Sequence, residues 1–350
     1  MRTWLTGILI IVIGASSAWT QGDEPDLFAL ISGRDPAVVQ AAIDAGADVN
    51  VRQTQGLEAT PLMWATGVGD PAFVEMLIEA GADVDVRDTM GDPAINWAAY
   101  YGNTPAIALL LDAGADTELV GHGTPVQIVM RRGHQHSLAV LIDHLDQQPD
   151  RSTVEEALEA AALSGDVPAI SALAAHVEMA SARDWAGRPL LQAAARANQS
   201  AAIEALINAG APVDAEDVIG FTALFEAARE GQSDAVAALL AGGANPNHVS
   251  HERALSLTPL HLAAIGGDVD SVSLLIDAGA NLDAVGTMGA TPLLWALFEG
   301  THEVALILVE AGADTTIAGN FGDTARPIAV AREWDDVVAA IDAQIAQPQD

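Results

Sequence analysis

The chain has 350 residues, of which 50% are hydrophobic, and it carries 48 Asp plus Glu against 14 arginines and no lysine. The formal net charge of −34 at pH 7 repels nucleic acid and anionic lipid, so neither is an expected partner. The chain has no Cys, which excludes disulfides and thiol chemistry.

The first 18 residues have the pattern of a secretory signal peptide. Arg2 precedes an uncharged apolar run at 5–15, and small residues follow at 16–18. The run is shorter than the ~20 residues that a membrane-spanning helix needs, so we expect cleavage near Ala18 and a short linker at 19–24. An uncleaved anchor is the alternative. The signal predicts export to the periplasm or the medium, without stable membrane insertion after cleavage.

Two sequence blocks recur through the rest of the chain. One block reads IDAGADVN at 43–50 and returns in altered form at 78–85, 111–118, 207–214, 240–247, 276–283 and 309–316. The other block reads TPLMWA at 60–65, TPLHLA at 258–263 and TPLLWA at 291–296, with looser copies between. A period near 33 residues with the pattern T-P-L-H-x-A resembles the ankyrin repeat.

The same blocks predict a pair of short helices in each repeat. Thr at a block start can cap a helix, and Pro suits the first helical turn. Glycines then suit left-handed helix ends, at Gly69, Gly102, Gly133, Gly231, Gly267 and Gly300. A second helix follows, for example at 270–277. The resemblance implies an all-α repeat solenoid of ankyrin repeats, each a helix–turn–helix with a β-hairpin loop. We expect about ten units including caps over 25–345 and a tail at 346–350.

The middle of the array departs from this pattern at about 143–188. The block at 156 lacks Thr-Pro, and the Gly-Ala turn is missing after two successive second helices. We interpret the stretch as sequence drift in one tolerant repeat. A bend or a weak joint between two halves is the alternative.

The sequence contains no catalytic or cofactor motif, so we expect neither enzymatic activity nor a bound cofactor. His134, His136 and His144 lie close in sequence, which raises the question of a metal site. They lack a clear ligand spacing, and His134 occupies a regular repeat position. We therefore expect no metal.

Three tryptophans, Trp64, Trp97 and Trp295, share one position of the repeat. An aromatic cage for a ligand is one interpretation of such a stripe. The resemblance implies that this position holds a buried Leu, so we interpret the tryptophans as core residues.

The resemblance also implies that hairpin tips and the ends of the first helices line a concave groove that holds a partner. Arginines gather at these positions, and both tyrosines of the chain lie there. Tyr, Trp and Arg dominate binding hot spots. The predicted partner-binding residues are Arg87, Tyr100, Tyr101, Arg131, Arg132, Trp185, Arg188, Arg196, Arg229 and Phe298. The alternative is that the arginines are structural, pairing with neighbouring acids or favouring helix ends.

The sequence thus predicts an exported, monomeric, non-catalytic protein-binding module. Its partner would be a protein or an extended peptide that can carry acidic groups, with most of the affinity between Tyr100 and Arg229. A periplasmic structural scaffold or envelope-maintenance factor, without a discrete groove ligand, is the alternative function.

Overall fold

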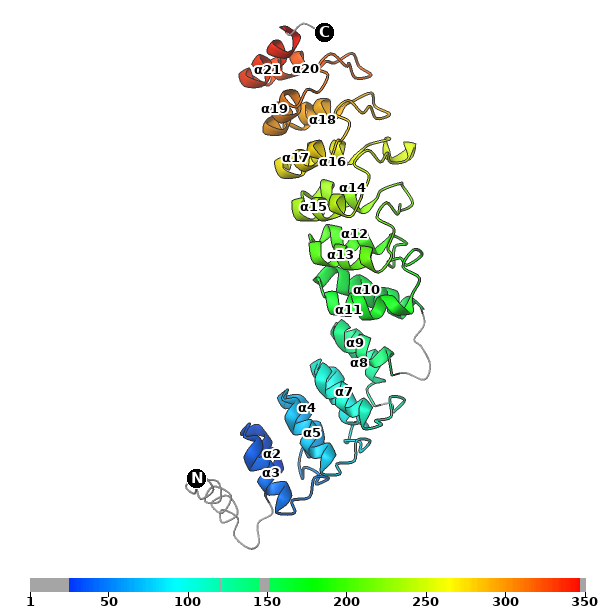
Figure 1. The fold of residues 1–350 in the computed structure, drawn as a ribbon, viewed down its shortest axis with the longest axis vertical. Coiled ribbons are helices and arrows are strands. Elements are labelled where there is room, and N and C mark those ends of the chain that lie inside the picture. Colours follow the sequence, from blue (N-terminus) through cyan, green and yellow to red (C-terminus); the bar gives the residue numbers. More distant parts are fainter. Residues whose placement is uncertain (1–24, 120, 145–150, 347–350) are drawn as a thin grey trace, which may run out of the picture. The chain divides into compact units, whose positions relative to one another are not determined.

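The computed structural model describes residues 25–119, 121–144 and 151–346 (Figure 1). The predicted signal peptide and the linker at 19–24 lie outside the described residues, as does most of the predicted tail. Within the described part the chain forms twenty α-helices and no β-strand. Those residues therefore confirm the expected all-helical repeat class, while the expected number of units stays a prediction.

The chain divides into two compact units, Met1–Pro149 and Asp150–Asp350, which are described separately. The N-terminal unit contains eight α-helices in its described part. They are α2 (Leu27–Ser32), α3 (Pro36–Asp44), α4 (Pro61–Val68), α5 (Pro71–Glu79), α6 (Ala94–Tyr101), α7 (Thr104–Asp112), α8 (Pro125–Arg132) and α9 (Gln135–Ile142).

The C-terminal unit continues the alternation of first and second helices. Its helices are α10 (Arg151–Ser164), α11 (Val167–Leu173), α12 (Leu190–Arg196), α13 (Ser200–Asn208), α14 (Ala223–Glu230), α15 (Ser233–Ala241), α16 (Pro259–Gly266), α17 (Val269–Asp277), α18 (Pro292–Glu299), α19 (His302–Glu310), α20 (Ala325–Ala331) and α21 (Asp335–Ala346). Two 3₁₀ turns, η1 (Ala174–His176) and η2 (Glu252–Ala254), lie between helices.

Helices of each unit stack in two rows. In the N-terminal unit α4, α6 and α8 contact one another in sequence, and α5, α7 and α9 form the second row. In the C-terminal unit the first-helix row lies between the second-helix row and the connecting loops, as the labels α14 to α19 show in Figure 1. Fully buried side chains such as Leu62, Phe73 and Ile107 fill the space between rows. Each unit thus hides its apolar surface by stacking neighbours.

The helix boundaries follow the predicted chemistry. Thr60 caps α4 by accepting the backbone N–H of Met63 at 3.4 Å, and Pro61 fills the first turn. All six predicted glycines end first helices in the left-handed conformation, Gly133 after α8 with φ of 73° among them. The prediction of left-handed helix ends is therefore confirmed. Glycine suits these positions because a residue with a Cβ is strained at such an angle.

The expected β-hairpin loops form turns instead of paired strands. In the loop before α6, for example, the Asp88 N–H donates to the Asp92 carbonyl oxygen at 3.1 Å and closes a single turn. The Thr89 N–H donates to the Leu57 carbonyl oxygen of the preceding loop at 2.9 Å. Hydrogen bonds this sparse do not form the regular ladder of a β-sheet. In the described loops the β-pairing is limited to an isolated bridge between Arg183 and Pro189.

The irregular stretch at 143–188 contains the division between the two units. Helix α10 has 14 residues and begins at Arg151, five residues before the predicted block start at 156. After α11 the 3₁₀ turn η1 stands where other repeats carry the Gly-Ala turn. The sequence departures therefore correspond to a longer first helix and a different second-helix ending.

Candidate functional site

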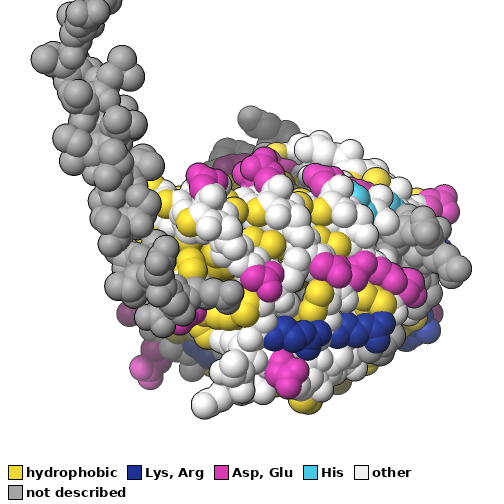
Figure 2. All heavy atoms as spheres, turned by 90° about the horizontal axis from the view of Figure 1, so that it is seen from below, with side chains coloured by type: hydrophobic (Ala, Val, Ile, Leu, Met, Phe, Trp, Pro, Cys, Tyr) yellow, Lys and Arg dark blue, Asp and Glu magenta, His cyan; other side chains and the backbone are white. Residues whose placement is uncertain are grey.

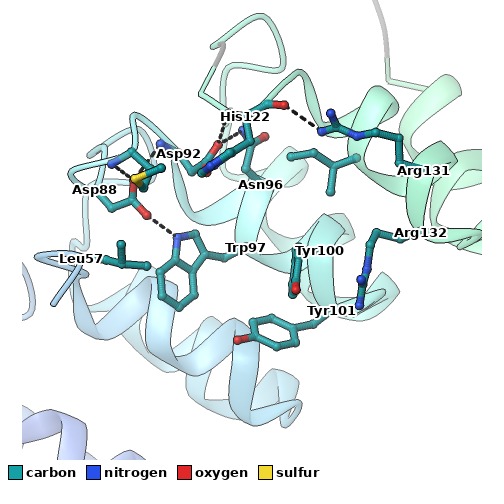
Figure 3. Close-up of a pocket in the computed structure, with 12 residues that line it drawn as sticks. Leu57, Asp88, Asp92, Asn96, Trp97, Tyr100, Tyr101, His122, Arg131 and Arg132 are labelled. Atoms are coloured by element: carbon teal, nitrogen blue, oxygen red, sulfur yellow. Dashed lines mark hydrogen bonds and ion pairs between the residues drawn. The ribbon is translucent and has the colours of Figure 1, made fainter.

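A pocket of about 590 Å³ opens in the N-terminal unit beside the last turns of α6 and α8 (Figure 3). This volume lies in the ~300–1,000 Å³ range of ligand pockets. Helix α6 contributes Trp97, Tyr100 and Tyr101, and α8 contributes Arg131 and Arg132. Three loops complete the wall with side chains that include Leu57, Met90 and His122.

The repeat register brings the two helix ends together. Helices α6 and α8 are neighbours in one row, and each ends at a left-handed glycine, Gly102 and Gly133. The Tyr100–Tyr101 pair therefore lies one repeat away from the Arg131–Arg132 pair, at the same position. Arginine in the last turn also suits the partial negative charge of a helix C-terminus, which gives these side chains a local reason to be there.

Aromatic rings and one guanidinium form a continuous surface in the pocket. The ring centres of Trp97 and Tyr101 are 6.4 Å apart, and Tyr100 meets Tyr101 edge to face at 5.3 Å. The guanidinium carbon of Arg132 lies 4.3 Å from the centre of the Tyr100 ring. A cation over an aromatic face is stabilised by about 0.5–1 kcal/mol at an exposed site. The contact holds Arg132 beside the rings.

Asp88 fixes the indole of Trp97 by a hydrogen bond. The Trp97 Nε1–H donates to Asp88 Oδ2 at 2.9 Å, and Asp88 Oδ1 accepts the backbone N–H of Met90 at 2.8 Å. The Asp88 residue is buried, and its carboxylate points away from solvent into its own loop. The carboxylate therefore orients the pocket wall and is already occupied as an acceptor.

Asp92, in the same loop as Asp88, ties two loops and α6 together. Its Oδ1 accepts from Asn96 Nδ2 at 2.8 Å and from the His122 backbone N–H at 2.9 Å, and its Oδ2 lies 2.5 Å from His122 Nδ1. Burial would raise the pKa of Asp92, but the hydrogen bonds from His122 and Asn96 outweigh it and hold the pKa below its usual value. A Cβ at Gly121 would lie 2.1 Å from Asp92 Oδ1, so this approach requires glycine.

The two arginines of α8 differ from the acid-paired arginines of the chain. Arg131 donates through Nη2 to the His122 carbonyl oxygen at 2.7 Å, while Arg132 stacks on Tyr100. Neither has a carboxylate oxygen within 4.0 Å among the described residues. Arginines paired with carboxylates elsewhere are Arg52, Arg151, Arg188, Arg229 and Arg326. Figure 2 shows basic side chains in a band beside apolar surface, with acidic groups around it.

Comparison with known proteins places the chain in a family. A family model described as ankyrin repeats (3 copies) matches residues 27–121, 158–250 and 247–318, which is more than half of the chain. The chain belongs to the ankyrin-repeat family. Ankyrin repeats are generally protein–protein interaction modules and are typically non-catalytic. No curated protein matches this ankyrin chain.

The ankyrin pocket brings together four of the predicted partner-binding residues, Tyr100, Tyr101, Arg131 and Arg132. Arg87 is exposed in the loop before α6 but does not line the pocket. Its backbone carbonyl oxygen accepts from Arg52 Nη2 at 2.9 Å, which links two adjacent loops.

The remaining predicted residues lie in the C-terminal unit. Trp185 is 87% exposed at a loop tip, and Phe298 is 42% exposed at the end of α18. Arg188 pairs with Asp184 at 2.8 Å, and Arg229 pairs with Glu226 at 2.7 Å. A role in partner binding stays a prediction for these C-terminal residues. The ion pairs of Arg188 and Arg229 agree with the alternative interpretation, in which arginines pair with neighbouring acids.

Two glutamates near the arginines of the C-terminal unit have raised pKa values. Burial raises the pKa of Glu226 against the lowering influence of Arg229, and burial also raises the pKa of Glu159, with the charge of Asp184 adding to it. The Arg196 side chain lies near both glutamates, and its Nη1 is buried without a hydrogen-bond partner among the described residues.

The expectation that the three repeat-position tryptophans are core residues is wrong. Trp64, Trp97 and Trp295 are all half-buried. Trp64 Nε1 donates to Ser32 Oγ at 2.9 Å, and Trp97 Nε1 donates to Asp88. Trp97 is therefore a pocket residue that the sequence analysis missed, although its position three residues before Tyr100 was a signal.

His261 fulfils the structural role expected for the His of T-P-L-H. Its Nδ1 lies 3.0 Å from the Thr258 backbone nitrogen, and its Nε2 lies 3.2 Å from the Ala290 carbonyl oxygen in the next loop. In the described ranges, groups of three or more His, Asp or Glu arranged to hold a metal are absent. The described helices are also all too short or too polar to cross a bilayer.

Proposed function

We propose that this chain is an exported, non-catalytic ankyrin-repeat protein that recognises a partner protein or peptide through the pocket of its N-terminal unit. The observation that carries the proposal is the surface formed by Trp97, Tyr100, Tyr101 and Arg132. Folding leaves Tyr100 48% and Tyr101 52% exposed, side by side. Tyr, Trp and Arg gathered in one concavity are typical of an interaction hot spot.

The mechanism we propose is recognition by a pre-formed surface. The rings are positioned by Asp88 and by ring contacts, and Arg131 is positioned by His122, before any partner arrives. Side chains that are already ordered lose less conformational entropy on binding. Export rests on the signal-peptide pattern at 1–18, and the partner would then be met in the periplasm or the medium.

The test is affinity capture from the native envelope and secreted fractions. The bait is the wild-type protein or the double variant Arg131→Glu, Arg132→Glu. We expect the variant to lose the partner while helical circular dichroism and thermal midpoint stay close to wild type, because both side chains are exposed.

The matched control is a single charge reversal in each unit. Arg132→Glu and Arg253→Glu change the net charge equally, and Arg253 lies in the exposed η2 turn of the C-terminal unit. Arg132→Glu should weaken capture and Arg253→Glu should not. Equal capture by wild type and the double variant would contradict the proposed site.

A further inference from the structure

We infer that the pocket recognises a partner segment in which a carboxylate side chain lies next to a large apolar side chain. The carboxylate would meet Arg131 and Arg132, and the apolar group would pack against Trp97 and Tyr101. The inference rests on the proposed function and names the chemistry of its partner.

The apolar half of the pocket is surface that folding has left uncovered. Leu57 is 39% exposed and lies beside Trp97 (Figure 3), and Met90, which is 49% exposed, lines the same pocket. Clustered exposed apolar groups of this kind mark interaction sites more often than isolated ones do. A large apolar side chain can cover these groups and the Tyr101 ring together, and its burial supplies the main favourable free energy.

The charged half presents donors that the fold does not use. The Tyr100 ring supports the guanidinium of Arg132, and this guanidinium makes no hydrogen bond among the described residues. Arg131 uses Nη2 for the His122 carbonyl oxygen. A planar guanidinium held in place can donate two parallel N–H groups to one carboxylate, which is a charge-assisted and geometrically specific contact.

The acids of the pocket do not satisfy these arginines. Asp88 accepts from Trp97 and Met90, and Asp92 accepts from Asn96 and His122, so both carboxylates face inward. Two arginines then balance two aspartates within the pocket, whereas the whole chain has a formal charge of −34. An approaching carboxylate therefore meets less repulsion at this pocket than the average charge of the chain would give.

The charge of the rest of the chain narrows the partner further. A polyanion such as a nucleic acid would contact two arginines but would also approach many acidic side chains. Its net electrostatic interaction with the chain is therefore repulsive. A peptide can instead carry one acidic residue next to an apolar one, with neutral or basic residues on either side. Its acidic residue then meets the arginines of the pocket, and its flanking residues meet the acids around the pocket. Charge complementarity thus favours a peptide segment with one acid, next to one large apolar residue, between neutral or basic neighbours.

Selection from a random-peptide display library on the purified full-length chain tests this chemistry. We expect the enriched peptides to share an Asp or Glu within two residues of an aromatic or large aliphatic residue. The same selection on Arg131→Gln, Arg132→Gln should lose the acidic preference. Enrichment of peptides without an acid, or no enrichment at all, would overturn the inference.

Solution affinities of one enriched peptide then separate the two arginines from the rest of the surface. Replacing its acid with the matching amide should weaken binding to wild type by about tenfold, as expected for loss of one charge-assisted pair. On Arg131→Gln, Arg132→Gln the acid and amide peptides should bind equally, which is the signature of direct coupling. An equal loss on wild type and variant would overturn the inference.

Failure of this inference is distinguishable from failure of the proposed site. Peptides that are neutral but still lost on Tyr101→Ala would leave the pocket as the binding site and reject only the carboxylate. Peptides that bind wild type, Tyr101→Ala and the arginine variant equally would reject the pocket itself.

Discussion

Gly67 of α4 lies directly against the ring of Tyr101 on the neighbouring helix α6. A Cβ added at Gly67 would come within 3.0 Å of Tyr101 Cε2. Gly67→Ala should therefore turn the Tyr101 ring and weaken partner binding several-fold. Stability should stay equal or rise by up to about 1 kcal/mol, because Ala is favoured over Gly inside a helix. Binding measured beside a urea unfolding curve checks both parts.

The chain offers a matched control in α16. Gly266 also lies in the last turn of a first helix, one position nearer the helix-ending glycine than Gly67. A Cβ there would approach backbone oxygens, the nearest being that of Arg229 at 3.3 Å, and no aromatic ring. Gly266→Ala should leave partner binding unchanged. If both alanine variants bind like wild type, the position of Tyr101 does not determine affinity.

The hydrogen bond between Trp97 and Asp88 should contribute more to stability than a tryptophan hydrogen bond to an exposed partner. Trp97→Phe removes the donor to Asp88 Oδ2 and leaves a buried carboxylate oxygen unpaired, which should cost about 1–3 kcal/mol. Trp64→Phe removes only a bond to the exposed Ser32, whose hydroxyl can turn to water. Urea midpoints should therefore fall clearly more for Trp97→Phe than for Trp64→Phe, and equal losses would contradict the account of Asp88.

Much of this pocket could be predicted from repeat register alone. The Tyr100–Tyr101 and Arg131–Arg132 pairs each precede a helix-ending glycine, so they had to lie one repeat apart on adjacent helices. The loop side chains could not be placed in this way, because the loops are fixed by turn bonds and cross-loop bonds. Examples are the bonds from Thr89 to Leu57 and from His122 to Asp92.

His261 predicts a pH dependence of stability in the C-terminal unit. Burial lowers the pKa of His261 from 6.5 to about 4, so the folded state holds it neutral. The unfolded chain takes up the proton below pH 6.5, and the free energy of unfolding should then fall by up to about 3 kcal/mol as the pH drops toward 4. The stability from this group is fully present above pH 6.5.

The control replaces His261 with the residue that another repeat of the chain carries at the same position. Gln127 occupies the same slot in α8, where its Oε1 accepts the Thr124 backbone N–H at 3.2 Å. His261→Gln should keep the fold and flatten the unfolding free energy between pH 6.5 and pH 4. A slope in the variant equal to that of wild type would show that His261 is not its source.

A ladder of side-chain bonds links successive turns that follow the second helices. Asn247 Oδ1 accepts the Asn281 backbone N–H at 2.6 Å, and its Nδ2 donates to the Gly279 carbonyl oxygen at 3.0 Å. Asn247→Ala removes both bonds and should lower the free energy of unfolding by about 1–2 kcal/mol.

Asn247→Asp keeps the acceptor and removes the donor, so its loss of stability should be smaller. The chain itself uses Asp85 and Asp283 as acceptors at matching positions. Thermal midpoints of the two variants decide the question. A larger loss in Asn247→Asp than in Asn247→Ala would mean that the added negative charge outweighs the ladder bond.

The limits of prediction are clearest in the C-terminal unit. Arg188 and Arg229 were predicted to bind a partner from their repeat positions, yet each pairs with an acid a few residues earlier, in one loop for Arg188 and on α14 for Arg229. The spacing of three from Glu226 was visible in the sequence and favours pairing on a helix, and Asp184 stood four residues before Arg188. Position in the repeat says where a side chain lies, whereas its immediate neighbours decide whether its charge is available.

Site-specific photo-crosslinking tests the central claim most directly. Placing p-benzoylphenylalanine at Tyr101 puts the reactive group in the pocket, and placing it at Val285, which is 52% exposed in a C-terminal loop, provides the control. In the native envelope and secreted fractions we expect a crosslinked partner band from position 101, absent from position 285 and lost when Arg131→Glu, Arg132→Glu is added. A band from position 285 but not from position 101 would contradict the pocket as the site of partner binding.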